Sequence, residues 1–425
     1  MTDTNQTDPA IEAFIQRNFR WNFLVNAFDG ATFGFGTAFF SSTIILPLFV
    51  SHYTDNPLVI GLIAFLGWGG VLLPQLFTAN AVQRAPLKKV FPVTLGFFLE
   101  RLPIFLLPLM IYTLADSKPL LTVVLFFVLY TWHNFGAGLI IVGWQDMIAK
   151  VIPVDKRGRF FGISNFLGNG MGILGALAVP VILGRYTFPL GYVAVFTITA
   201  VFFFISWVSL SLTREPAVPS SKPPVSQAAY LRSLPQILRR DHNFRAFLIA
   251  QIAFALSGMA TGFLVVYTAR TWDLPDAQAS GFMVALQIGL VLANLGFGFF
   301  SDRRGHKLTL EITCLLNILV LGLAAIAPNP SWFFAVFFLS GAVSAGSFIS
   351  GISIVYEFTA AEDRPTYIGL ANTIPGIAVT LAPLLGGWLA GVMDYQPMFI
   401  TAAVFGLVSW ILLHFIVREP RQGNG

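Results

Sequence analysis

The stretch Gly298-Phe-Phe-Ser-Asp302-Arg303-Arg304-Gly305-His306-Lys307 lies between two long apolar runs of the chain. A carboxylate followed by several cations is costly to place in hydrocarbon, so we expect this stretch to lie at a membrane surface. Gly305 would supply the positive φ of a tight reversal, and Gly298 would let the backbone approach a neighbour closely. Asp302 is placed to accept hydrogen bonds at the N-terminus of a neighbouring helix. The alternative is an ordinary basic loop between two membrane helices.

The composition of the chain indicates an integral membrane protein. Its 425 residues are 56% hydrophobic and only 11% charged, whereas soluble domains carry about 25% charged residues. The basic pI of about 9.4 needs no nucleic-acid partner, because membrane proteins collect basic residues on their cytoplasmic side. The single cysteine, Cys314, excludes an intramolecular disulfide and a cysteine-rich metal site. We expect no metal, no cofactor and, from the polar first 20 residues, no signal peptide.

Apolar runs long enough to cross about 30 Å of hydrocarbon occur twelve times in the sequence. Backbone groups in lipid must be satisfied internally, and the runs lack the alternation of barrel strands, so each run should be helical. The sequence therefore predicts an all-α integral membrane protein with 12 transmembrane helices. The expected spans are 22–50, 58–79, 90–114, 119–147, 160–183, 188–213, 246–269, 279–300, 308–327, 331–356, 367–392 and 397–417.

The distribution of basic residues predicts the orientation of these spans. Of the 25 Lys and Arg residues, 21 fall on the side that both termini would share. The opposite side carries three, and Arg101 falls inside a span. The excess on one side places both termini in the cytoplasm and predicts a multi-pass protein of the cytoplasmic (inner) membrane.

A proline- and serine-rich segment divides the chain into two comparable halves. We expect a six-helix bundle over 1–213, a cytoplasmic linker over 214–245 and a second six-helix bundle over 246–425. An acidic residue, an arginine, a glycine and an asparagine recur around Arg157 and Arg364, at an offset of 207 residues. The halves therefore look like a parallel repeat.

These features resemble the major facilitator superfamily (MFS) of secondary transporters. The signature loop of that family is matched at Gly298, Asp302, Arg303, Gly305 and Lys307. The resemblance implies two pseudo-symmetric six-helix bundles, the MFS fold, with a substrate site between them near the midplane. It also implies a cytoplasmic gate, in which Asp302 would meet the start of the fifth span near Arg157 and Arg159, with Arg364 as the counterpart in the second half. The loop of the first half departs from the family pattern, with Gln83 and Pro86 in place of Asp and Gly.

Four ionisable residues inside the predicted spans are candidates for proton coupling: Asp29, Glu100, Arg101 and His133. Neighbouring helical residues diverge by about 100°, so Glu100 and Arg101 should not easily neutralise each other. Arg101 could reach Asp29, and one carboxylate would be left over to take up and release a proton. The alternative is a static charge network, which we favour for Glu100 and Arg101, whereas we favour the proton role for Asp29. A lone histidine such as His133 is more often a hydrogen-bonding core residue.

The family resemblance further implies that spans 1, 4, 7 and 10 line the transport pathway. Small residues on those spans could instead permit close helix packing, which we prefer for at least one of the serines. The candidate cavity residues are Tyr130, Trp132, Asn134, Gln251, Ser257, Tyr267, Ser340 and Ser344.

The predicted function is secondary active transport of a small solute by alternating access, with protons as the expected coupling ion. Efflux of a lipophilic or drug-like compound is slightly favoured, because the expected lining is aromatic and weakly charged. Uptake of a neutral solute such as a sugar, by symport or uniport, is the alternative. A non-transporting receptor or a membrane-embedded enzyme is the alternative from another class. No Walker A or H-E-x-x-H sequence occurs, so neither ATP hydrolysis nor zinc proteolysis is expected. The sequence shows no convergent nucleophile–base or acid–base set at one membrane face, so we expect no enzyme activity. We expect a monomer in the lipid bilayer.

Overall fold

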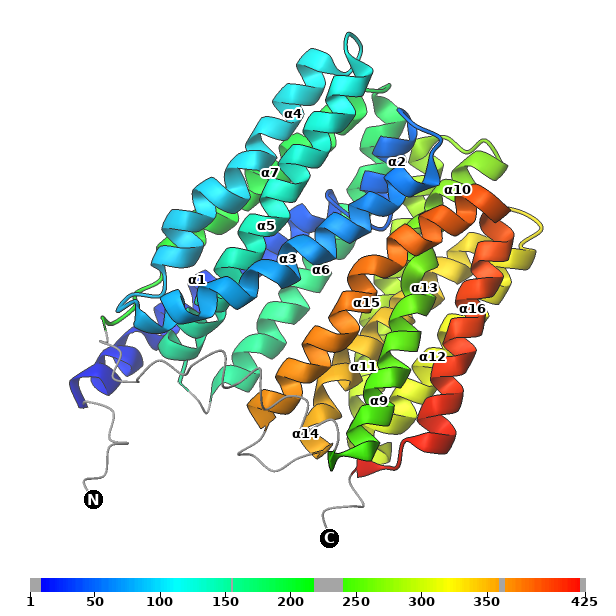
Figure 1. Cartoon of the computed structure of the whole chain (residues 1–425). Helices are drawn as coiled ribbons and strands as arrows, with labels where there is room; N and C mark the ends of the chain where they lie inside the picture. Colours follow the sequence, from blue (N-terminus) through cyan, green and yellow to red (C-terminus); the bar gives the residue numbers. More distant parts are fainter. Residues whose placement is uncertain (1–8, 154–155, 218–239, 359–363, 421–425) are drawn as a thin grey trace. The chain divides into compact units, whose positions relative to one another are not determined.

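The computed structural model describes residues 9–153, 156–217, 240–358 and 364–420, and these form helices joined by turns and short loops, with no strand (Figure 1). The first helices in chain order are α1 (Pro9–Ala38), α2 (Ile45–Ser51), α3 (Pro57–Arg84), the π-helices η1 (Val90–Leu95) and η2 (Phe97–Arg101), α4 (Leu102–Leu114), α5 (Pro119–Val151), α6 (Arg157–Arg185) and α7 (Leu190–Ser211). They are followed by α9 (His242–Ser257), the 3₁₀-helix η4 (Gly258–Phe263), α10 (Leu264–Thr271), α11 (Asp276–Arg304), α12 (His306–Ile326), α13 (Trp332–Ser353), α14 (Val355–Phe358), α15 (Arg364–Met393), α16 (Tyr395–Ile411) and the π-helix η5 (Leu412–Ile416).

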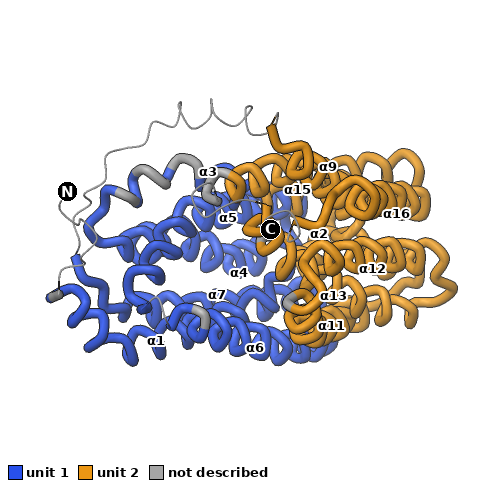
Figure 2. The backbone as a smooth tube through the Cα atoms, turned by 90° about the horizontal axis from the view of Figure 1, so that it is seen from below, with its two compact units in different colours: residues 1–41, 69–224 blue, residues 42–68, 225–425 orange. Residues whose placement is uncertain are grey.

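The chain forms two compact units, which Figure 2 shows in different colours. Unit 1 comprises Met1–Ser41 and Gly69–Pro224, and unit 2 comprises Ser42–Trp68 and Val225–Gly425. The segment Ser42–Trp68 is tied to unit 2 by polar contacts: His52 Nε2 lies 2.6 Å from Asp276 Oδ2. The division into functional halves at residues 213 and 246 stays a prediction.

The structure supports the expected transmembrane architecture. Among the described residues, eleven helices are long and apolar enough to cross a membrane. The first predicted span, over 22–50, is not one helix, because α1 ends at Ala38 and α2 starts at Ile45. The hydropathy of α1 is lowered by polar side chains. Three of these, Asn22, Asn26 and Asp29, are buried inside unit 1 rather than exposed to lipid. We therefore count α1 as the twelfth span.

Several predicted spans are not single α-helices. The span expected over 246–269 is built from α9, η4 and α10, because the helix changes to 3₁₀ at Gly258. The span expected over 90–114 starts with the two π-helices before α4 begins. Apolar periodicity cannot distinguish these variants from an α-helix, since all of them bury similar side chains.

Candidate functional site

The third span positions two charged residues through its π-helical stretch. In η2 the backbone N–H of Leu102 bonds to the carbonyl of Phe97, five residues earlier. Pro103 has no N–H, so it cannot donate to the carbonyl of Leu99 as a helical residue at that position normally would. The widened turn carries Glu100 and Arg101, which are buried inside unit 1.

Helix α5 lies directly against this π-helical turn. A Cβ atom placed on Gly136 would collide with the backbone carbonyl of Leu99, so only glycine permits this approach. One turn earlier on α5, His133 Nδ1 lies 2.8 Å from the carbonyl oxygen of Glu100. A carbonyl oxygen can only accept, so Nδ1 of His133 carries the proton and donates it. Gly136 and His133 together hold the backbone around Glu100 in place.

Glu100 and Arg101 form an ion pair with each other. The expectation that these neighbours cannot neutralise each other is therefore wrong. It assumed α-helical geometry, whereas the wider π-helical turn rotates less per residue. The guanidinium carbon of Arg101 also lies 5.2 Å from the ring centre of Phe33 and 5.3 Å from that of Phe203. Such cation–π contacts stabilise a cation that has left water.

Asp29 is the second carboxylate of this region. Its Oδ1 accepts a hydrogen bond of 2.6 Å from Ser206 on α7, and its side chain is buried. Asp29 also interacts electrostatically with Arg101 and Glu100. Because Glu100 pairs with Arg101, Asp29 is the acid of this group for which the described residues show a hydroxyl partner instead of an ion pair. We call Asp29, Glu100, Arg101, His133 and Ser206 the embedded charge cluster.

The predicted cavity residues of unit 1 do not all reach this cluster. Tyr130 is buried and lies 5.9 Å, ring centre to ring centre, from Phe40, which also contacts the ring of His133. Asn134 donates to the backbone carbonyl of Tyr130, one turn earlier on its own helix. Trp132 is 38% exposed on another face of α5.

In unit 2 the predicted cavity residues are engaged in internal contacts. Ser340 and Ser344 each bond to a backbone carbonyl one turn earlier in α13. Ser257 accepts a hydrogen bond of 2.6 Å from Asn317. Tyr267 accepts from Gln396 and lies in an aromatic cluster with Trp272, Phe333, Tyr395 and Phe399, whereas Gln251 is half-buried on α9. Substrate contact by these residues stays a prediction.

The signature loop forms the expected reversal between α11 and α12. Gly305 has φ of +96°, a conformation that disfavours other residues. Within unit 2, no described atom lies within 4 Å of a Cβ placed on Gly298, so the expected close approach is not found there. Lys307 pairs with Glu311 at 3.3 Å, and Arg303 is exposed.

The structure describes the side chains of two other predicted gate residues, Arg157 and Arg159. Arg157 donates to the carbonyls of Ala149 and Ile152, at the end of α5. Arg159 is exposed. The side chains of Asp302 and Arg364 lie outside the described residues, and their gate role stays a prediction.

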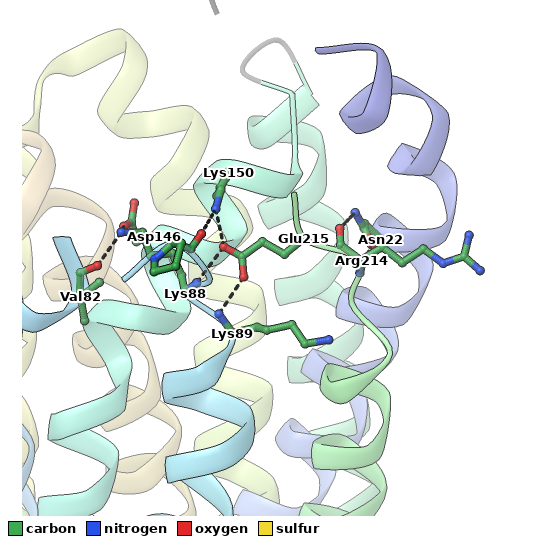
Figure 3. Close-up of polar contacts among 9 residues, drawn as sticks. Asn22, Val82, Lys88, Lys89, Asp146, Lys150, Arg214 and Glu215 are labelled. Atoms are coloured by element: carbon green, nitrogen blue, oxygen red, sulfur yellow. Dashed lines mark hydrogen bonds and ion pairs between the residues drawn. The ribbon is translucent and has the colours of Figure 1, made fainter. Parts of the chain in front are cut away.

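A buried carboxylate at the end of unit 1 was missed by the sequence reasoning. Glu215 accepts hydrogen bonds of 2.8 Å from the backbone N–H groups of both Lys88 and Lys89, as Figure 3 shows. Its Oε1 is also 2.8 Å from Nζ of Lys150 on α5. A carboxylate at this position satisfies N–H groups that precede the third span and have no helical partner. Glu215 therefore ties the end of α7 to the start of the third span.

The backbone of Arg214 is fixed by an asparagine on α1. Asn22 accepts from the N–H of Arg214 and donates to its carbonyl, both over 2.9 Å (Figure 3). In unit 2, Asn243 brackets Arg418 in the same way, at 2.7 and 3.1 Å. We call each of these pairs an asparagine clasp.

The sequence signal for the two clasps is the repeated tripeptide Arg-Glu-Pro at 214–216 and 418–420. The carboxylate oxygens of Glu419 would lie 3.4 and 3.5 Å from a Cβ on Gly305, at the start of α12. Each half thus ends with a glutamate beside the start of its third span.

Comparisons with known proteins identify the kind of protein to which this architecture belongs. The sequence model of the Major Facilitator Superfamily matches residues 28–286 and 246–425. The uncharacterized MFS-type transporter YfkF of Bacillus subtilis (strain 168) is 25% identical over 405 residues, which cover 90% of this chain and 93% of YfkF. The multidrug resistance protein MdtL of Salmonella paratyphi B is 27% identical over 136 residues, 32% of this chain and 34% of MdtL. The crystal structure of the nucleoside transporter NupG superposes with a TM-score of 0.65 at 15% identity, over 93% of this chain and 98% of NupG.

Proposed function

This chain belongs to the Major Facilitator Superfamily and is a multi-pass membrane transporter of small molecules, and we propose that it couples transport to protons through Asp29. The observation that carries the proposal is the charge balance of the embedded charge cluster. Glu100 and Arg101 neutralise each other, whereas Asp29 is bonded to the neutral hydroxyl of Ser206.

The physical argument rests on the cost of a buried charge. An unpaired charge inside a membrane protein costs several kcal/mol, so an embedded acid is a functional candidate by default. Binding a proton neutralises Asp29. The hydroxyl of Ser206, which donates a hydrogen bond to the carboxylate, can then accept one from the carboxylic acid. The same serine thus serves both protonation states without moving far. His133 supports the cluster from α5, because its Nδ1 donates to the backbone of Glu100.

For the substrate, we propose efflux of a lipophilic or drug-like compound. Aromatic residues make up 15% of the chain and charged residues 11%, which suits an apolar solute better than a multiply charged one. The similarity of part of the chain to a multidrug resistance protein supports the same class. Uptake of a neutral solute by symport or uniport is the second candidate. The basic residues on one side of the spans support an orientation with both termini in the cytoplasm of the inner membrane.

The test is substrate-driven proton movement in proteoliposomes that contain a pH-sensitive dye. A panel of lipophilic cations, sugars, amino acids and organic anions is added outside. Alkalinisation of the lumen would show antiport and support efflux, whereas acidification would show symport and favour uptake. We expect the response to be lost in Asp29→Asn and kept in Glu12→Gln, which removes an exposed carboxylate of the same helix. Accumulation to equilibrium without proton movement would overturn the coupling proposal.

A further inference from the structure

Unit 1 carries an apolar groove on its outer surface, between α1 and α7. The groove has a volume of about 520 Å³. Its walls are Trp21, Leu24 and Phe28 from α1, and Phe204 and Val208 from α7, with further apolar neighbours. The one polar side chain in the lining, Ser209, uses its hydroxyl to donate to the backbone carbonyl of Val25. The groove therefore offers only apolar surface to an occupant.

The exposed residues of α1 form a stripe that runs from charged to apolar. Arg17, Trp21, Leu24 and Phe28 are all exposed and follow each other at intervals of four, three and four residues, which places them on one helix face. From Trp21 to Phe28 the stripe extends about 10 Å along the helix axis. One leaflet of the hydrocarbon core is about 15 Å deep. The groove is therefore long enough to hold a large part of one acyl chain.

A cation is held at the charged end of this groove. The guanidinium carbon of Arg214 lies 4.9 Å from the ring centre of Trp21, and its Nη1 donates to Asn18 over 3.1 Å. Trp21 is itself fixed, because its Nε1 donates to the backbone carbonyl of Leu212. In Figure 3 the side chain of Arg214 extends away from Glu215. Arg214 is exposed, so its positive charge stays accessible at the end of the groove.

We propose that this groove binds one anionic phospholipid, with an acyl chain between α1 and α7 and its phosphate beside Arg214 and Arg17. Charge complementarity supports this occupant: the lining has no acidic residue, and two exposed arginines lie at one end. A basic residue near a membrane surface attracts an anionic lipid by about 1 kcal/mol. A tryptophan at this depth is typical of the membrane interface, where its ring is amphipathic. The site is separate from the embedded charge cluster and does not depend on proton coupling.

The test uses the full chain, purified in neutral detergent, stripped of lipid and titrated with dioleoyl phosphatidylglycerol or dioleoyl phosphatidylcholine. Native mass spectrometry counts the lipids retained. We expect one phosphatidylglycerol to be retained in preference to phosphatidylcholine, and Arg214→Gln to weaken its binding by about fivefold. As a control, Arg185→Gln changes an exposed arginine at the C-terminal end of α6, and it should leave the binding unchanged.

A second variant tests whether the groove binds an acyl chain, without changing any charge. Val208→Trp fills the groove from α7, and its elution and thermal unfolding report whether the fold is kept. We expect it to reduce phosphatidylglycerol retention as strongly as Arg214→Gln does. Equal retention of the two lipids by the wild type would overturn the proposal. So would full retention by a folded Val208→Trp, because the headgroup alone would then account for binding.

Discussion

Ser206 donates its hydroxyl hydrogen to Oδ1 of Asp29 over 2.6 Å, and this bond joins α7 to α1 inside unit 1. Both residues are buried. The hydroxyl of Ser206 can donate a hydrogen bond to the carboxylate form of Asp29 and can accept one from its protonated form.

Ser206→Ala should lower both the thermal stability and the coupled proton flux. The substitution leaves a buried carboxylate without its donor, which costs about 1.5–3 kcal/mol. Thermal unfolding in detergent and the proteoliposome assay measure the two effects. Thr199→Ala removes another buried hydroxyl of α7, one that bonds to the backbone of Val195, and should leave the flux unchanged. Unchanged flux in Ser206→Ala would contradict a role in coupling.

Gly136→Ala should destabilise unit 1 by forcing η2 away from α5. The added methyl group collides with the backbone around Leu99, and overpacking of this kind costs about 1–3 kcal/mol. Because the displaced turn carries Glu100 and Arg101, transport should fall together with the unfolding temperature. Gly322→Ala is the matched control, since no described atom lies within 4 Å of its added Cβ. An unchanged unfolding temperature in Gly136→Ala would show that the two helices separate without cost.

Glu215→Gln should lower the unfolding temperature, because it weakens the cap on the N–H groups of Lys88 and Lys89 and removes the ion pair with Lys150. Hydrogen bonds to a charged group contribute about 1.5–3 kcal/mol. Asp116→Asn, which changes an exposed carboxylate, is the control. If both variants unfolded at the wild-type temperature, Glu215 would not stabilise the start of the third span.

Both asparagine clasps should stabilise the fold, and the clasp of Asn22 should contribute more, because Asn22 is buried whereas the contacts of Asn243 are exposed. Asn22→Ala and Asn243→Ala each remove two hydrogen bonds to the backbone of an arginine, so each should cost about 1–3 kcal/mol of stability. Chemical or thermal unfolding of the two variants provides the comparison, and Asn329→Ala, at an exposed position, provides the control. A loss of stability confined to Asn243→Ala would contradict this order.

The sequence was informative about the membrane spans and about the reversal at Gly305. Both depend on local properties, namely the length of an apolar run and the need for positive φ. The sequence also identified Asp29, Glu100, Arg101 and His133 as embedded residues, because charged and polar groups are conspicuous in an apolar run.

The partners of these residues could not be read from the sequence. The ion pair between Glu100 and Arg101 lies on a π-helical turn, and α5 packs against this turn at Gly136, 36 residues after Glu100 in the chain. Ser206 lies 177 residues from Asp29 and looks like any other small residue of a membrane helix. The Arg-Glu-Pro repeat is present in the sequence, but only the structure shows that an asparagine binds the backbone of the arginine in each copy.

The most direct test of the central claim is an infrared titration of the purified protein that follows the carbonyl stretch of protonated carboxylic acids. It requires no knowledge of the substrate. We predict a pH-dependent component of this absorption in the wild type and in Glu12→Gln that is missing in Asp29→Asn, whereas the components from the other carboxyl groups remain. If this component persisted unchanged in Asp29→Asn, a different group would bind the proton, and Asp29 would be a structural residue.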